Sequence, residues 1–255
     1  MPTPFTHLAV AGEMLAHPLL SPQAKAGLLA QLPAFLLGNT APDVQTLSGQ
    51  PREATHFFPV PLRQAPPAAP RLLAQYPALA LRAALPPAQA AFLAGYLAHL
   101  VFDQLWVRDI FEPVFVEEPG WASFHERLYL HNVLRAHWDA QDLERLPPGA
   151  AVSLKAAQPA AWLPFVDERH LSAWRDLIAD QLGAGQGRTV EVFAQRMRVD
   201  PREFAALLAS PTELERRVFS HLPHGALADY RARALARGVE VIDAYWQGAP
   251  LPSQL

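Results

Sequence analysis

Apolar residues recur at helical spacing along most of the chain. Ala and Leu dominate these stretches, β-branched residues are sparse, and alternating polar and apolar runs are nearly absent. Ala and Leu favour helices, and an apolar stripe of this period marks the face that a helix buries. The sequence therefore predicts an all-α fold, a bundle of many helices.

Proline and capping residues mark where the first helices begin. Thr3 precedes an apolar-periodic stretch over 4–16, and Ser21 precedes Pro22, which suits the first position of a helix. The stretch "PAFLLG" predicts a short buried helix or turn ending at Gly38. Further helices are expected over 71–85, 87–106, 122–141 and 225–246.

A long irregular loop is expected over residues 39–61, where Pro, Gly and polar residues interrupt the pattern. Loops of this length inside compact domains are uncommon and often functional. A second irregular stretch, residues 146–164, reads as a linker. Beyond it, "DPREF" and "SPTEL" each place a Glu three residues after a capping residue.

The most unusual helix is "FLAGYLAHLVFDQLW", because its only ionisable residues are His99 and Asp103. A buried charge is costly unless it is paired, hydrogen-bonded or bound to a metal. Four positions apart on a helix, the two side chains share a face, about 5–6 Å apart at Cβ. They can reach one cation at about 2.0–2.2 Å each. A plain His–Asp hydrogen bond in the core fits the pair equally well.

Three further residues strengthen the interpretation as a metal site. Asp43 follows Pro42 in "GNTAPD", His56 lies among aromatic residues in "REATHFF", and His7 lies in "PFTHLAV". Each alone has a structural explanation, as a turn residue, a packed ring or a core histidine. Together with the helical pair they offer His and carboxylate ligands, which can fill a zinc shell without cysteine. The chain has no cysteine, so thiolate zinc sites, disulfides and cysteine nucleophiles are excluded.

Five segments, "PFTHL", "FLLGNTAPD", "THFF", "GYLAHLVFDQLW" and "HNVLRAHWD", resemble the bacterial zinc-dependent phospholipase C family, which is related to the single-strand-specific zinc nucleases. The resemblance covers residues 4–140. It implies an all-helical fold with a metal site in a cleft between helices, and hydrolysis of phosphodiester bonds with zinc-activated water. By matching motif positions, it implies these ligands: Asp43, His56, His99 and Asp103 in one site, with Asp103 bridging to a neighbouring ion that His7 helps to hold.

The sequence departs from that family at two places. The secreted phospholipases begin with a Trp that binds metal, whereas this chain begins Met-Pro. They also carry a His-x-x-x-Glu pair, whereas the residue four after His131 is Arg135. His131 and Asp139 lie two turns apart on one helical face, which makes His131 the remaining candidate ligand. We therefore expect one or two zinc ions; manganese and iron suit the same ligand types.

Two functions follow from these candidates. The first is a zinc-dependent hydrolase of phosphodiester bonds, phospholipase C-like, in which Asp43 orients or deprotonates the attacking water. Its substrate would be a small-molecule or lipid phosphodiester. The alternative is a non-catalytic helical protein stabilised by a structural metal site or a His/Asp network, which the missing ligands favour. The sequence leaves the substrate and the oligomeric state open.

The organisation, charge and termini add expectations about context. Residues 1–145 are expected to form the metal-binding helical core, with 146–255 as additional helices packed on it in one globular domain. The net charge of −3 gives no basic excess for nucleic acid or an anionic membrane surface. The apolar run at 90–102 is too short for a membrane span, and no signal peptide is evident, so a cytoplasmic protein is expected.

Overall fold

The computed structural model describes residues 1–121, 123–146, 149–183 and 189–254. Within these residues the elements are helices and helical turns, with no strand, so the predicted all-α class is confirmed. The α-helices are α1 (Pro4–Ala16), α2 (Pro22–Ala30), α3 (Leu32–Thr40), α4 (Gln45–Ser48), α5 (Glu53–His56), α6 (Ala68–Gln75), α7 (Pro87–Trp106), α8 (Phe124–Leu143), α9 (Ala150–Lys155), α10 (Glu168–Gly183), α11 (Thr189–Met197), α12 (Pro201–Leu208), α13 (Pro211–Arg217) and α14 (Ala226–Gln247).

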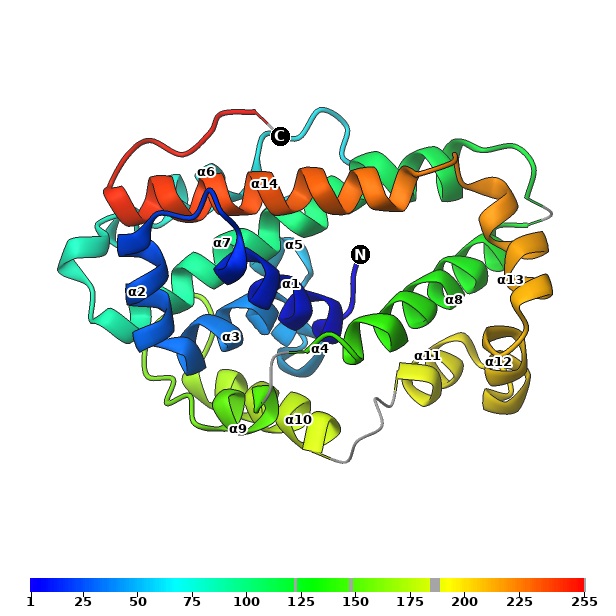
Figure 1. Ribbon diagram of the computed structural model, residues 1–255, viewed down its shortest axis with the longest axis horizontal. Helices are drawn as coiled ribbons and strands as arrows, with labels where there is room; N and C mark the ends of the chain where they lie inside the picture. The colour runs from blue at the N-terminus through cyan, green and yellow to red at the C-terminus, as the bar shows by residue number, and fades with distance from the viewer. Residues whose placement is uncertain (122, 147–148, 184–188, 255) are drawn as a thin grey trace.

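The helix α7 is the centre of the fold. Every residue from Ala90 to Trp106 is buried, because α3, α6 and α14 pack around it. Figure 1 shows α14 running along one side of α7, with α1 and α3 on the other side. A helix covered on all faces needs apolar residues all round, which explains why this segment lacks an amphipathic pattern.

The chain remains helical beyond α7. Residues Val107–Glu117 form a π-helix, η4, which contains Pro113. The whole run Pro87–Glu117 is long and apolar enough to cross a membrane, and its most apolar window is entirely buried by the rest of the protein. This helical run is longer than the apolar run at 90–102, which was expected to be too short to span a membrane.

The expected loop over 39–61 is wrong in part. The helix α3 continues two residues past Gly38 to Thr40, and is followed by the 3-10 turn η1 (Ala41–Val44), α4 and α5. Gly38 does not end its helix because it serves a packing contact, described below. Elements of four residues are too short to show an apolar period, so the pattern could not reveal them.

The boundaries of other elements also differ. The helix expected over 71–85 ends at Gln75, since Pro77 disfavours helical geometry before it, and two 3-10 turns, η2 (Pro77–Leu79) and η3 (Arg82–Ala84), follow. The helix α8 begins after Ser123, whose side chain accepts a hydrogen bond from the Glu126 N–H. Ala122, where this helix was expected to begin, lies outside the described residues.

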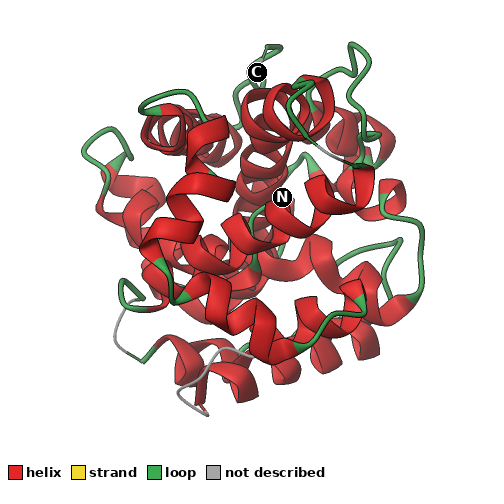
Figure 2. Cartoon of the chain, turned by 90° about the vertical axis from the view of Figure 1, so that its right-hand side faces the viewer, coloured by secondary structure: helices red, strands yellow, loops and turns green. Residues whose placement is uncertain are grey.

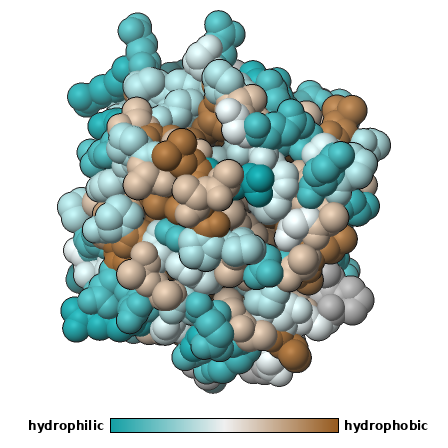
Figure 3. All heavy atoms as spheres, turned by 90° about the vertical axis from the view of Figure 1, so that its left-hand side faces the viewer, coloured by the Kyte–Doolittle hydropathy of each residue, from teal (hydrophilic) through white to brown (hydrophobic). Residues whose placement is uncertain are grey.

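The second half of the chain packs on the first. The expected linker contains α9, which contacts α3 and α10, while α11 and α12 contact α8; its residues 147 and 148 lie outside the described part of the chain. One hydrophobic core joins residues of both halves. Figure 2 shows the N-terminal end of α1 surrounded by helices. Figure 3 shows the end of the molecule that carries α2, where apolar residues gather in the middle of the face among hydrophilic ones.

Two glycines let the backbones of α3 and α7 touch. A Cβ on Gly38 would lie 2.0 Å from the carbonyl oxygen of Phe92, and a Cβ on Gly95 would lie 2.4 Å from that of Phe35. Both distances are impossible for real atoms. Any larger residue at either position must therefore separate the helices.

We predict that Gly38→Ala destabilises the protein by roughly 2–4 kcal/mol, because the added methyl overpacks a backbone contact. The intrinsic helix propensity acts in the opposite direction by only about 1 kcal/mol. Urea denaturation of both proteins measures the difference. Gly183→Ala is the matched control, since a Cβ there meets no atom of the described residues within 4 Å; its stability should be unchanged or slightly higher. Equal stability of Gly38→Ala and the wild type would contradict the packing argument.

Candidate metal centre

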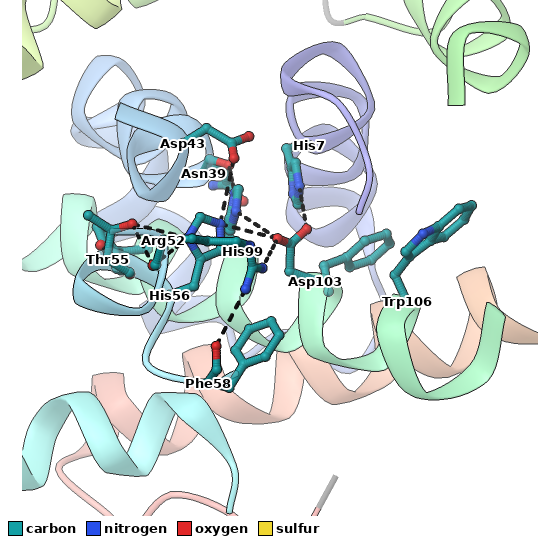
Figure 4. A network of polar contacts seen from close by, with 12 residues as sticks. His7, Asn39, Asp43, Arg52, Thr55, His56, Phe58, His99, Asp103 and Trp106 are labelled. Carbon is teal, nitrogen blue, oxygen red and sulfur yellow. Dashed lines mark hydrogen bonds and ion pairs between the residues drawn. The ribbon is translucent and has the colours of Figure 1, made fainter. Parts of the chain in front are cut away.

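Four elements bring five ionisable side chains to one point (Figure 4). The helix α1 supplies His7, η1 supplies Asp43, α5 supplies His56, and α7 supplies both His99 and Asp103. All are buried except Asp43, whose side chain is 21% exposed. The residues come from segments up to 96 positions apart (103 − 7), so the fold, and not the local sequence, makes the cluster.

The carboxylate of Asp103 is the centre of this cluster. Its Oδ1 lies 3.3 Å from His7 Nε2, and its Oδ2 lies 3.2 Å from His56 Nε2 and 3.6 Å from His99 Nε2. His56 Nε2 is also 3.5 Å from Asp43 Oδ1. Ligand atoms that surround zinc tetrahedrally at about 2.1 Å lie about 3.4 Å from one another. The observed spacings match that geometry.

Two overlapping groups could hold a metal ion. His7, His99 and Asp103 form one group, and Asp43, His56 and His99 form the other; in each, the ligand atoms lie within 4.8 Å of one another. The two groups share His99, and Asp103 lies within 4 Å of ligands from both. One ion, or two ions close together, would fit these ligands.

Backbone contacts orient two of the imidazoles. His99 Nδ1 lies 2.8 Å from the Asn39 carbonyl oxygen, and His56 Nδ1 lies 3.3 Å from the Arg52 carbonyl oxygen. A carbonyl oxygen only accepts, so Nδ1 of His99 carries a proton and donates. In the neutral ring, Nε2 then presents a lone pair to the cluster. Metal-bound histidines are held by the same type of outer contact.

The atoms that face the centre have no other partner. Among the described residues, Nε2 of His7, His56 and His99 and Oδ1 of Asp103 are buried without a hydrogen bond. A lone pair on nitrogen and a carboxylate oxygen repel each other at these distances unless a positive charge lies between them. A metal ion or a set of protons can supply that charge. The residues at the centre therefore fit a bound cation.

The pKa values show which groups are charged. Burial raises the pKa of Asp103, but His99 and the two other imidazoles outweigh it and hold the pKa well below its usual range. Burial also acts against ionisation of Asp43, but the contact with His56 and the nearby His99 lower its pKa to about 2. Burial, aided by His99, lowers the pKa of His7 to about 4. The centre therefore holds two carboxylates and a neutral His7 at neutral pH.

Two guanidinium groups that the sequence analysis did not identify as part of the site lie near these carboxylates. Arg52 Nη2 is 3.0 Å from Asp103 Oδ2, and its guanidinium lies 4.4 Å from the centre of the Phe58 ring. Arg135 is close enough for Asp43 and Asp103 to act on its pKa, although burial dominates and lowers it to about 10. In the sequence, the spacing of four residues between Arg52 and His56 was the feature that could have placed Arg52 on the same helical face as His56.

His131 is not among the side chains that meet at the centre. Its Nε2 accepts a hydrogen bond from the Trp106 indole N–H at 3.0 Å, and its ring packs against Phe111 and Phe115. Burial lowers its pKa well below the usual value. The Nε2 atom of His131 is thus occupied by a donor, and neither candidate metal group includes this residue. The eight-residue spacing to Asp139 placed both on α8 but did not bring them to the cluster.

Asp139 has a separate environment. It is buried, and the hydroxyls of Thr3 and Thr189 donate hydrogen bonds to its two carboxylate oxygens. Burial is the main cause that raises its pKa to about 7, against the opposing effects of Thr189, the Thr6 backbone and Arg135.

Comparison of the chain with family models, with curated proteins and with solved structures found no match in any of the three. The motifs quoted above therefore carry the resemblance to the zinc-dependent phospholipases by themselves. The structure adds that the matching positions His7, Asp43, His56, His99 and Asp103 lie together in space.

We predict that zinc raises the melting temperature of the metal-free protein. Free metal at 100 times its Kd stabilises a folded protein by about 2.7 kcal/mol, which for a chain of this size corresponds to roughly 5–10 °C. His99→Gln should remove most of this shift, because His99 belongs to both ligand groups. Asp180→Asn changes a carboxylate that is 74% exposed and should keep the full shift. Equal shifts in both variants would place the metal elsewhere.

We predict that Asp139→Asn alters the pH dependence of stability. The folded-state pKa of about 7 lies above the unfolded value, so between about pH 4 and pH 7 only the unfolded state releases the proton, and wild-type stability falls. An amide mimics the protonated acid, so the variant should match the wild type near pH 3 and exceed it at pH 8 by up to roughly 4 kcal/mol. Denaturant titrations at both pH values measure this; Asp180→Asn should show no such divergence.

Proposed function

We propose that this protein is a zinc-dependent hydrolase of phosphodiester bonds, similar to the zinc-dependent phospholipases C. One observation carries the proposal: three buried imidazole nitrogens without a hydrogen-bond partner among the described residues lie 3.2–3.6 Å from the two carboxylate oxygens of Asp103, which is the spacing of metal ligands. The motif resemblance over residues 4–140 supports the reaction type. Zinc is proposed as the metal because His and carboxylate ligands suit it, although manganese and iron accept the same ligands.

A divalent ion in such a site supplies Lewis acidity, which lowers the pKa of water and neutralises phosphoryl oxygens. The chain supplies the positioning. Asp103 and the three histidines are buried and fixed, whereas Asp43 is the one member of the five with an appreciably exposed side chain. Substrate and water therefore approach from the side of Asp43. There its carboxylate can serve as a ligand, or can orient and deprotonate the attacking water.

The charges around the centre favour an anionic substrate once a metal ion is bound. The carboxylates of Asp43 and Asp103 are balanced by the guanidinium groups of Arg52 and Arg135. A divalent cation adds two positive charges to this balanced set. Inside a protein of low dielectric constant, that excess attracts a phosphodiester, which carries one negative charge.

A second candidate function is a non-catalytic helical protein in which the His/Asp network is structural. The ion pair between Arg52 and Asp103 favours it, because a guanidinium already neutralises the central carboxylate. Asp103 also outweighs burial and raises the pKa of His99, so a proton is a further means of satisfying the cluster. In that case chelators would leave stability unchanged, and no phosphodiester would be hydrolysed.

The decisive experiment uses Asp103→Asn, which keeps the shape of the side chain but removes its charge. We expect the wild type to retain one or two zinc ions after purification and to hydrolyse bis(p-nitrophenyl) phosphate. The variant should bind zinc at least tenfold more weakly and lose activity by roughly 100-fold or more. Zinc content by mass spectrometry and p-nitrophenol release give the two measurements.

Two controls interpret the result. Asp180→Asn should leave both zinc content and turnover unchanged, and Asp43→Asn, at a more exposed position, should reduce turnover even if Asp103→Asn proves unstable. Wild-type turnover by folded Asp103→Asn would overturn the proposal. Zinc bound to the wild type without any hydrolysis of phosphodiesters would instead support a structural metal.

A further inference from the structure

A cavity of about 230 Å³ lies beside the candidate metal centre. Its walls come from the beginning of α1, from η1 and α4, and from α8, α10 and α11. Figure 1 shows α8, α10 and α11 on the side of the molecule where the N-terminal end of α1 lies. Asp43 belongs both to the centre and to the cavity wall, so the two are neighbours.

The cavity wall carries two cationic side chains. Arg135 comes from α8 and Arg196 from α11, and they are close enough to lower the pKa of Arg135 through mutual repulsion, in addition to the larger effect of burial. The Arg135 guanidinium lies 4.6 Å from the centre of the Phe193 ring, and its Nη1 donates to Asn132 Oδ1 at 2.9 Å. Arg196 lies on the exposed side of α11. The pair thus extends from the protein interior to solvent.

Two buried donors in this wall have no acceptor. Among the described residues, Nε of Arg135 and Nε1 of Trp174 lack a hydrogen-bond partner, and Trp174 is only 4% exposed. Buried N–H groups are nearly always paired in folded proteins. Both atoms are inaccessible to water, so they mark hydrogen-bonding capacity behind the cavity wall that the described residues leave unused.

The rest of the wall is largely apolar. Phe5, Ile178 and Phe193 are buried, and Leu47 and Leu177 are 43% and 38% exposed. Exposed leucines at the surface of a cavity, next to buried aromatic rings, suit an apolar group that enters from solvent. The cavity has room for roughly eight water-sized groups.

Two acidic groups also line the cavity, and neighbouring groups offset the negative charge of each. Asp43 lies 3.5 Å from His56 Nε2, and the Asp139 carboxylate accepts from two threonine hydroxyls and has a pKa of about 7. Near neutral pH, the two arginines therefore give the cavity wall a net charge that is positive or zero. That balance does not suit a cationic group.

We propose that this cavity binds an oxyanion attached to a small apolar group, with the guanidinium groups of Arg135 and Arg196 pairing with the oxyanion and the α10 and α11 side chains contacting the apolar part. Binding at this site does not need a metal ion. One consequence rests on the proposed function. If the protein hydrolyses a phosphodiester, one group esterified to the phosphorus would occupy this cavity, and that group would carry both an apolar part and a negative charge. A phosphate or carboxylate group would satisfy the same donors.

The experiment titrates the EDTA-treated protein with n-hexyl phosphate in low salt at pH 6.5 and measures binding by calorimetry. Inorganic phosphate and n-hexanol are the two separate halves of this probe. We expect n-hexyl phosphate to bind at least tenfold more tightly than either half, because both the arginines and the apolar wall contribute. Equally tight binding of n-hexanol would overturn the role of the arginines, and equally tight binding of inorganic phosphate would overturn the role of the apolar wall.

Substitutions assign the binding to this cavity. Arg135→Gln should weaken n-hexyl phosphate at least tenfold, Arg135→Lys should lose less because it keeps the charge, and Arg196→Gln should weaken it severalfold. Arg202→Gln, an exposed residue on α12 outside the cavity wall, is the matched control and should bind as the wild type does. Unchanged affinity in both Arg135→Gln and Arg196→Gln would overturn the proposal. If Arg135→Gln fails to fold by circular dichroism, Arg196→Gln alone decides.

The same titration separates this inference from the hydrolase proposal. Asp103→Asn should bind n-hexyl phosphate at least as tightly as the wild type does, because Asp103 is not part of the cavity wall and its substitution removes a negative charge near Arg135. A protein without zinc or hydrolytic activity that still binds the probe through Arg135 would contradict only the proposed function. If the protein is a zinc-dependent hydrolase but does not bind n-hexyl phosphate, only the cavity assignment is contradicted.

Discussion

The close contact between α3 and α7 is the constraint on which the candidate centre depends. Gly38 and Gly95 each face a backbone carbonyl oxygen of the other helix, with no space for a side chain between them. This contact fixes Asn39, whose carbonyl oxygen holds the imidazole of His99. It also determines where α3 ends, and therefore where η1 places Asp43. A shift of the two helices by the width of a methyl group would move ligands that now lie 3.2–3.6 Å apart.

Burial gives the centre its chemical character. In water, a histidine and an aspartate at these distances would interact weakly, but in the interior each charge must be matched by another. The protein matches the carboxylate of Asp103 with Arg52 on one oxygen and leaves the other oxygen to face His7. The guanidinium and the unpaired nitrogens therefore act on opposite sides of one carboxylate. This division makes the site more than a single hydrogen bond in the core, and both a metal ion and a network held by protons fit it.

The sequence predicted the class of fold and much of the site, for identifiable reasons. The long helices α1, α7 and α14 have enough turns for caps and apolar spacing to define them. His99 and Asp103 could be paired because their separation of four is a property of any helix. The meeting of these residues with Asp43 and His56 was suggested by motif order, not by local geometry.

Other features could not be read from the chain. The short elements α4 and α5 are formed by packing and lack a period of their own. His131 was expected to be a ligand from residue type and helical face, but rotation of α8 directs its nitrogen to Trp106. Arg52 and Arg135 carry no motif, and surface arginines are so common that only their burial reveals their role.

All five side chains of the centre precede residue 104, whereas most of the cavity wall lies between residues 135 and 196. During synthesis, the ribosome thus releases the whole ligand set before α10, α11 and α14 exist. The order of the chain separates the assembly of a cation site from the later addition of the surfaces that surround it. Changes to the C-terminal half can therefore reshape the surfaces around the centre while the five side chains themselves stay the same.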